Sequence, residues 1–202
     1  MSLVKFIYKL NLANSNTFAA AIDPKTISFF TDGSCVGNGK KNAIGGFSAI
    51  CVSGYKKNTL VYGKVNNEKS VTNIRAEGYA ILAVFELLLS EIECTKWNKC
   101  IIYTDSEFWL KMIYNYMPKW SIDTFSTKAN PDLTICMWDI WKKINRSDKT
   151  IEIIHVYAHN KDNSQNSPDP FKKFSHDNNA LADELAGIAR ELLEYGTVIE
   201  VV

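Results

Sequence analysis

Four acidic residues occupy positions where a charge would be costly or unexpected. Asp32 and Asp105 each end an apolar run inside the string Thr-Asp-(Gly)-Ser. Glu77 lies early in the most apolar helical segment, where an ionised side chain is costly unless it is paired or bound to a metal. Asp183 lies among small residues in NALADELAGIA. Taken singly, each acid also fits a structural role, as a turn former, a helix first-turn residue or part of an exposed helix face.

Taken together, the four acids would supply an oxygen-ligand cage suited to hard divalent cations such as Mg²⁺ or Mn²⁺. Cys and His residues at zinc-ligand spacing are absent, which disfavours zinc. Such a cage could hold two ions about 3.5 to 4 Å apart, one activating the nucleophile and the other stabilising the leaving oxygen of a phosphoryl displacement. The pattern therefore predicts a phosphodiesterase.

The elements that must position these acids follow the order βββαβααβα, which predicts an α/β domain. Apolar or alternating runs indicate five strands of a mixed sheet, the first three antiparallel and the last two parallel. The predicted strands are 27–34, 45–55, 59–66, 99–106 and 150–159, and the predicted helices are 72–91, 106–116, 131–144 and 178–194. Asn130 before Pro131 predicts the start of the third helix.

Length and composition indicate one ordinary folded domain. The chain has 202 residues, of which 46% are hydrophobic and 22% charged, and this excludes disordered and low-complexity classes. The formal net charge is only +1, so no global positive field indicates a polyanion partner.

The cysteines and the lengths of the apolar runs indicate the cellular compartment of the protein. The five cysteines lack any C-x-x-C pair and predict free thiols rather than a disulfide framework. No apolar run approaches the roughly 18 residues of a membrane span, and polar residues interrupt any signal-peptide core in residues 1–25. We expect an intracellular protein of the cytoplasm or nucleus that is not secreted.

The sequence resembles the type 1 ribonucleases H in four signature blocks. These blocks are TDGSCVGNG (31–39), TNIRAEGYA (72–80), IYTDSE (102–107) and NNALADELA (178–186). The resemblance implies a ribonuclease H-like fold, with an N-terminal extension at 1–25, a catalytic domain at 26–195 and a C-terminal tail at 196–202. It also implies an endonuclease that hydrolyses the RNA strand of RNA–DNA hybrids with two Mg²⁺ ions, for which Mn²⁺ can substitute, leaving 5′-phosphate and 3′-hydroxyl ends.

The resemblance assigns roles to the acids and to a histidine. Asp32 would bridge two ions, Glu77 and Asp105 would complete one ion site, and Asp183 would help bind the ion on the nucleophile side. His159 matches a family histidine thought to assist proton transfer or product release. His159 and Asp183 are 24 positions apart, a wider spacing than in compact members, which indicates an insertion between them. His176, within it, is an alternative to His159.

Substrate contacts are likewise implied by the resemblance. The matching positions are the main chains of Gly33 and Ser34, Asn38 and Asn73 in the minor groove, Thr72 at a DNA phosphate, and Trp120 in a DNA-gripping protrusion. Asn38 and Asn73 also fit turn and cap chemistry, and Trp120 also fits a residue that covers the core. Glu107 stands where many relatives have Gln, and the added charge could strengthen cation attraction or weaken phosphate approach.

Two other functions fit parts of the pattern. The same fold could be a catalytically silent hybrid reader, but such a module has no need to keep all four acids. A resolvase or transposase-type nuclease fits the metal chemistry but not the contexts around Glu77 and Asp183. We expect an RNA–DNA hybrid as the partner of a monomer, with no membrane and no obligate protein partner.

Overall fold

The computed structural model describes residue 6 and the ranges 23–66, 70–157 and 169–202. A six-stranded sheet forms the middle layer, with the strand order β5-β4-β1-β2-β3-β6. Its strands are β1 (Thr26–Val36), β2 (Ile44–Ser53), β3 (Thr59–Lys64), β4 (Lys99–Thr104), β5 (Thr150–His155) and β6 (Gly196–Val201).

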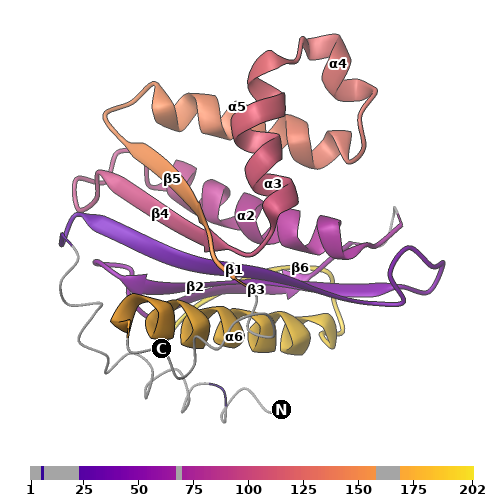
Figure 1. Ribbon diagram of the computed structural model, residues 1–202, viewed down its shortest axis with the longest axis horizontal. Helices are drawn as coiled ribbons and strands as arrows, with labels where there is room; N and C mark the ends of the chain where they lie inside the picture. The colour runs from indigo at the N-terminus through magenta and orange to yellow at the C-terminus, as the bar shows by residue number, and fades with distance from the viewer. Residues whose placement is uncertain (1–5, 7–22, 67–69, 158–168) are drawn as a thin grey trace.

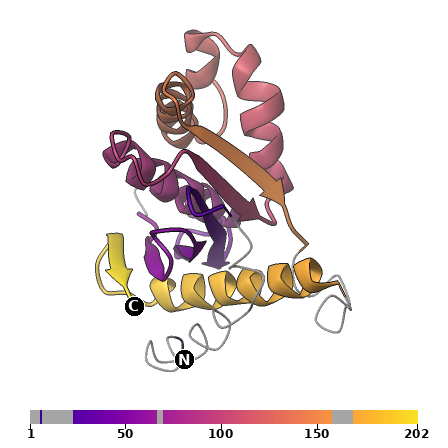
Figure 2. The same ribbon diagram turned by 90° about the vertical axis from the view of Figure 1, so that its left-hand side faces the viewer.

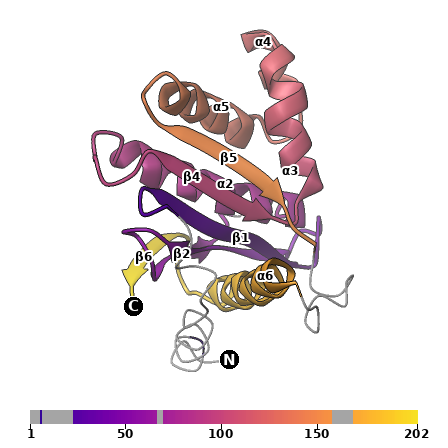
Figure 3. The same ribbon diagram turned by 60° about the vertical axis from the view of Figure 1, so that its left-hand side comes forward.

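Strand directions agree with the prediction for the first five strands. β1, β2 and β3 are antiparallel neighbours, and β4 and β5 lie parallel to β1 on its other side. Figure 3 shows these three parallel strands running toward the same end of the sheet. The carboxyl ends of parallel strands in an α/β sheet are where binding sites assemble.

Helices cover both faces of the sheet. They are α2 (Asn73–Ser90), α3 (Glu107–Lys111), α4 (Ile122–Ser126), α5 (Pro131–Asn145) and α6 (Pro170–Arg190), and a π-helical turn (Met112–Tyr116) and a 3-10 turn (Met117–Lys119) follow α3. Helix α6 covers one face and α2 the other, with α5 packed on α2 (Figure 1). The α3–α4–α5 segment projects beyond α2, away from α6 (Figure 2).

Alternation along β1 creates the two cores. Successive side chains of a strand point to opposite faces, so Phe29 joins the core beneath α2 while Phe30 joins the core against α6. Phe85 of α2 and Leu185 of α6 are fully buried on their respective sides. The sheet is therefore held from both faces, and the edge where β4 and β5 end stays fixed relative to both helices.

Three expectations about the elements were wrong. The sheet has six strands rather than five, because residues 196–201 of the expected tail pair with β3. The last helix begins at Pro170 rather than near residue 178, because Phe174 packs in the α6 core and extends the helix by two turns. Asp32 does not end its strand, because β2 pairs with β1 as far as Val36.

None of the helices in the described ranges is long and apolar enough to cross a membrane.

Candidate active site

Asp32 and Asp105 lie at the point where parallel pairing stops. Thr31 of β1 and Thr104 of β4 are the last paired residues of these two strands, and the two aspartates come next. β4 ends there, while β1 continues along β2. The repeated Thr-Asp string therefore places one carboxylate on β1 and the other directly after the neighbouring strand β4.

Glu77 reaches this edge because α2 approaches β1 unusually closely. A Cβ atom on Gly33 would lie 2.1 Å from the Glu77 backbone nitrogen and 2.4 Å from the Ala76 carbonyl carbon. Since no side chain fits in that space, only glycine allows this approach. Gly33 therefore lets the N-terminal part of α2, which includes Glu77, pack directly against the residue that follows Asp32.

Asp183 reaches the same edge from the opposite face. Ser48 of β2 pairs with Asp32, and its hydroxyl donates a hydrogen bond to the Ala182 carbonyl oxygen at 2.6 Å. A Cβ atom on Gly46 would lie 2.3 Å from the Ala186 carbonyl oxygen, so α6 also depends on a glycine for its close approach. These contacts place Asp183 over the strand that carries Asp32.

The four carboxylates share one electrostatic environment. Burial raises the pKa of Asp32 well above its ordinary value, and the charges of Asp105, Asp183 and Glu77 raise it further. Burial also raises the pKa values of Asp105 and Glu77. Only the Gly33 N–H, which donates to Asp32 Oδ1 at 2.6 Å, works in the opposite direction at Asp32. The site therefore concentrates negative charge that favours a cation.

Glu77 is held by a chain of hydrogen bonds. Asn73 Nδ2 donates to Glu77 Oε1 at 2.8 Å, and the Ser106 hydroxyl donates to Glu77 Oε2. Asn38 Oδ1 in turn accepts the Asn73 N–H at 2.9 Å. Two residues predicted to contact substrate are thus linked to a predicted metal ligand.

The four carboxylates are ligands of the type that a hard divalent ion prefers, although they do not form a complete set of converging ligands. Of the side chains that the structure describes, no three from His, Cys, Asp and Glu converge tightly enough to hold a metal ion. Both oxygens of Glu77 are instead engaged by protein donors. Carboxylate oxygens are the ligands that Mg²⁺ prefers, and the ion pairs of the described residues do not include any of the four acids.

Two residues near the site were not predicted from the sequence. His155 pairs with Thr104 across β4 and β5, and its charge lowers the pKa of Asp105. Asn179 is fully buried, lies one helical turn before Asp183, and also lowers the pKa of Asp105. Parallel pairing of the predicted strands could have indicated His155, and the i, i+4 spacing to Asp183 could have indicated Asn179.

Three other residues that were predicted to contact substrate interact with neighbouring side chains or backbone groups of the protein. Ser34 lies on β1, and its hydroxyl accepts a hydrogen bond from Arg190 Nη1 at 2.6 Å. Thr72 caps α2 by accepting the Arg75 N–H at 3.2 Å. Trp120 lies in the projecting helical segment, where its ring contacts Phe125 at 5.1 Å between centroids.

The remaining candidate residues are one glutamate and two histidines. Glu107 forms a 2.8 Å ion pair with Lys111 on the exposed face of α3. His159 lies outside the described residues. His176 lies within α6, two turns before Asp183.

Comparison with known proteins identifies the family. The model for the family described as RNase H matches residues 24–191. The chain belongs to the RNase H family. No curated protein matches it in sequence.

Solved structures share the RNase H fold at low sequence identity. The Prototype Foamy Virus protease–reverse transcriptase aligns with a TM-score of 0.63 and 16% identity over 86% of this chain, which spans only 22% of that protein. LC9-RNase H1, a type 1 RNase H with the type 2 active-site motif, gives 0.58 and 17% over 89% of this chain and 79% of its own. LC11-RNase H1, solved with an RNA/DNA hybrid, gives 0.53 and 18% over 82% and 96%.

Proposed function

We propose that this RNase H family member is an endonuclease that hydrolyses the RNA strand of RNA–DNA hybrids, leaving 5′-phosphate and 3′-hydroxyl ends. The observation that carries the proposal is the gathering of Asp32, Glu77, Asp105 and Asp183 at one sheet edge from two strands and two helices. The hybrid complex of LC11-RNase H1 supports the choice of substrate.

Two divalent ions, Mg²⁺ or Mn²⁺, would be held by the four acids. Asp32 is influenced by the charges of the other three acids and would bridge the ions. Glu77 and Asp105 would complete one ion site, and Asp183 would serve the ion on the nucleophile side. Bound ions would lower the pKa of the attacking water and neutralise charge that develops on the phosphate. The raised pKa of Asp32 favours this proposal, because a buried acid surrounded by acids gains most from a cation.

The residues around Glu77 would read the hybrid. Asn38 and Asn73 offer amide donors and acceptors to base edges and sugars, and the main chains of Gly33 and Ser34 would lie near the 2′-hydroxyl that distinguishes RNA from DNA. Thr72 would contact a DNA phosphate. Because Asn73 also bonds Glu77, binding of the sugar and placement of the carboxylate would be linked.

Two more groups complete the proposal. His159 would assist proton transfer or product release. In the projecting helical segment, Lys128 Nζ lies 5.7 Å from the Trp120 ring centroid, so an aromatic surface and a cation stand together where the DNA strand would be gripped.

The test uses Asp105→Asn and a labelled RNA–DNA hybrid in Mg²⁺. We expect wild-type protein to cut the RNA strand and the variant to lose at least about 10²-fold in rate, with an unchanged circular dichroism spectrum. Double-stranded RNA and branched DNA are the comparison substrates. Wild-type turnover of branched DNA in preference to hybrid would contradict the proposal, as would retained cleavage by the variant.

A further inference from the structure

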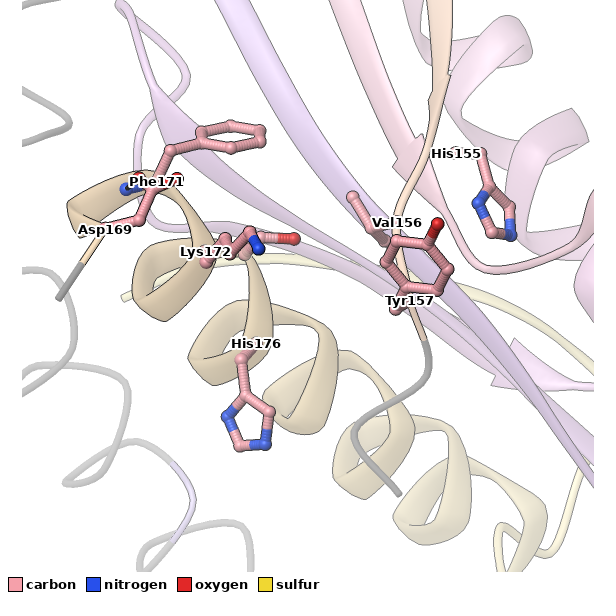
Figure 4. Close-up of a pocket in the computed structure, with 8 residues that line it drawn as sticks. His155, Val156, Tyr157, Asp169, Phe171, Lys172 and His176 are labelled. Atoms are coloured by element: carbon pink, nitrogen blue, oxygen red, sulfur yellow. Dashed lines mark hydrogen bonds between the residues drawn. The ribbon is translucent and has the colours of Figure 1, made fainter. Parts of the chain in front are cut away.

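A cavity of about 190 Å³ lies between the end of β5 and the first turns of α6. Its walls include His155 and Tyr157 on the strand side and Phe171, Lys172 and His176 on the helix side (Figure 4). All of these residues belong to the part of the chain that the structure describes. The helical wall of the cavity consists of the two turns by which α6 exceeds its predicted length.

This helical wall is firmly attached to the sheet. The Phe171 ring lies 6.0 Å from the Tyr103 ring, and the Phe174 ring lies 5.5 Å from the Phe30 ring, as measured between centroids. Asp169 caps the helix by accepting the Phe171 N–H at 2.9 Å. These contacts fix the backbone that presents Lys172 and His176.

The cavity adjoins the carboxylates through His155. This residue lines the cavity and pairs with Thr104 of β4, the residue that precedes Asp105. Its ring contacts the Tyr157 ring edge-on at 5.5 Å between centroids. A molecule bound in the cavity would therefore lie next to the edge of the sheet that carries Asp105.

The lining combines a stacking surface with a cation. Tyr157 is 66% exposed, and Lys172 lines the cavity from the α6 side (Figure 4). Ser175 and His176 add polar groups. Asp169 is the acidic residue of the lining, and its carboxylate caps α6. Aromatic faces beside Lys or Arg are how single-stranded nucleic acids are bound, and a hydroxyl or imidazole can bond a 2′-hydroxyl.

We propose that this cavity is a subsite for an unpaired ribonucleotide of the RNA strand, next to the hybrid that occupies the carboxylate site. Tyr157 would stack on the base, and Lys172 would contact the phosphate. The proposal rests on the proposed function, since it takes the RNA strand to be the one cut. It adds that the enzyme prefers hybrids whose RNA strand continues beyond the duplex.

The test compares a blunt hybrid with hybrids that carry a four-nucleotide RNA extension at the 5′ or the 3′ end. Fluorescence anisotropy in Ca²⁺ measures Kd, and cleavage in Mg²⁺ measures KM. We expect one of the two extensions to tighten binding by about 5- to 10-fold, as one stacked base does. The ratio of the Kd for the blunt hybrid to the Kd for the extended hybrid measures this gain. Tyr157→Ala and Lys172→Gln should each reduce the ratio toward 1.

Lys173→Gln is the matched control, because Lys173 pairs with Asp177 at 3.1 Å and does not line the cavity. It should keep the ratio of the wild-type protein. Equal affinity for blunt and extended hybrids would overturn the subsite, and so would an equal gain from DNA extensions. A blunt hybrid that is bound but not cut in Mg²⁺ would instead contradict the proposed function, while the Kd ratio would still test the subsite.

Discussion

The hydroxyl of Ser106 donates a hydrogen bond to Glu77 Oε2, so the residue that follows Asp105 holds the carboxylate of α2. The same hydroxyl caps α3 by accepting the Trp109 N–H. One serine thus sets the start of a helix and the orientation of a predicted metal ligand.

Replacement of Ser106 tests this positioning role. We expect Ser106→Ala to lower kcat on the hybrid by about 10-fold, because a misplaced carboxylate weakens a preorganised site, and to cost about 1 kcal/mol of stability through the lost cap. Ser106→Thr should restore both, since it keeps the hydroxyl. Ser121→Ala is the control, because Ser121 caps α4 in the projecting helical segment instead. A similar loss of kcat in both alanine variants would argue against positioning.

Gly33 tests the close approach of α2 to β1. Because a Cβ atom would lie 2.1 Å from the Glu77 nitrogen, Gly33→Ala must push α2 away from the sheet. We expect a loss of about 1–3 kcal/mol of stability in urea denaturation, as for other overpacked sites, together with loss of hybrid cleavage. Gly187→Ala is the control, because nothing lies within 4 Å of its Cβ position. Tolerance of alanine at Gly33 would contradict the packing described for α2.

The raised pKa of Asp32 predicts how the stability of the protein depends on pH. Its pKa is raised in the folded protein by burial and by Asp105 and Asp183, so the native state keeps a proton that the unfolded chain releases above about pH 4. Stability should therefore fall as pH rises from about 4 through the raised pKa of Asp32. Asp32→Asn removes this penalty and should raise the melting temperature at pH 7 without metal, by about 2–4 °C for each kcal/mol recovered.

Divalent ions supply the second arm of this measurement. Mg²⁺ should raise the melting temperature of the wild-type protein, because a ligand that binds only the native state stabilises it, and should do so less in Asp32→Asn. Asp123→Asn, on the exposed first turn of α4, is the control and should behave as wild type in both arms. A variant less stable than wild type at pH 7 without metal would refute the predicted sign.

Arg75 links the first turn of α2 to the start of α5. Its guanidinium, whose side chain is 4% exposed, bonds Asp132 at 2.7 and 3.1 Å and Asn130 Oδ1 at 3.0 Å. We expect Asp132→Ala to cost about 2 kcal/mol, because it leaves a buried cation without its carboxylate partner. Glu152→Gln should cost less than about 1 kcal/mol, since its pair with Lys99 is exposed. Equal losses of unfolding free energy in Asp132→Ala and Glu152→Gln, measured by urea denaturation, would contradict the stabilising role of the Arg75–Asp132 contact.

Much of the fold could be predicted because its elements carry strong local patterns. Apolar runs fixed the first five strands to within a few residues of their observed bounds, and Asn130 with Pro131 marked the start of α5. The observed cap is different in kind, because Asn130 has a left-handed backbone and its side chain accepts a hydrogen bond from Arg75 rather than from its own helix.

The missed elements depend on partners that are distant in sequence. β6 is a short edge strand whose residues are mostly exposed, and only its pairing with β3 identifies it. The first turns of α6 are polar apart from Phe171 and Phe174, whose partners lie on β4 and β1. Such contacts are unfavourable to form until the sheet exists, so no local signal reports them.

The sequence by itself determined the four acids, the order of the motifs that carry them and the near-neutral charge of the chain. An acid in an apolar helix is unfavourable without a partner, and the sequence pattern alone therefore marks Glu77. The tertiary structure decided that the acids come near one another, because Gly33 of β1 and Gly46 of β2 let α2 and α6 pack closely against two neighbouring strands. It also decided which neighbours hold them, since Ser106, His155 and Asn179 become neighbours only through strand register and helix packing.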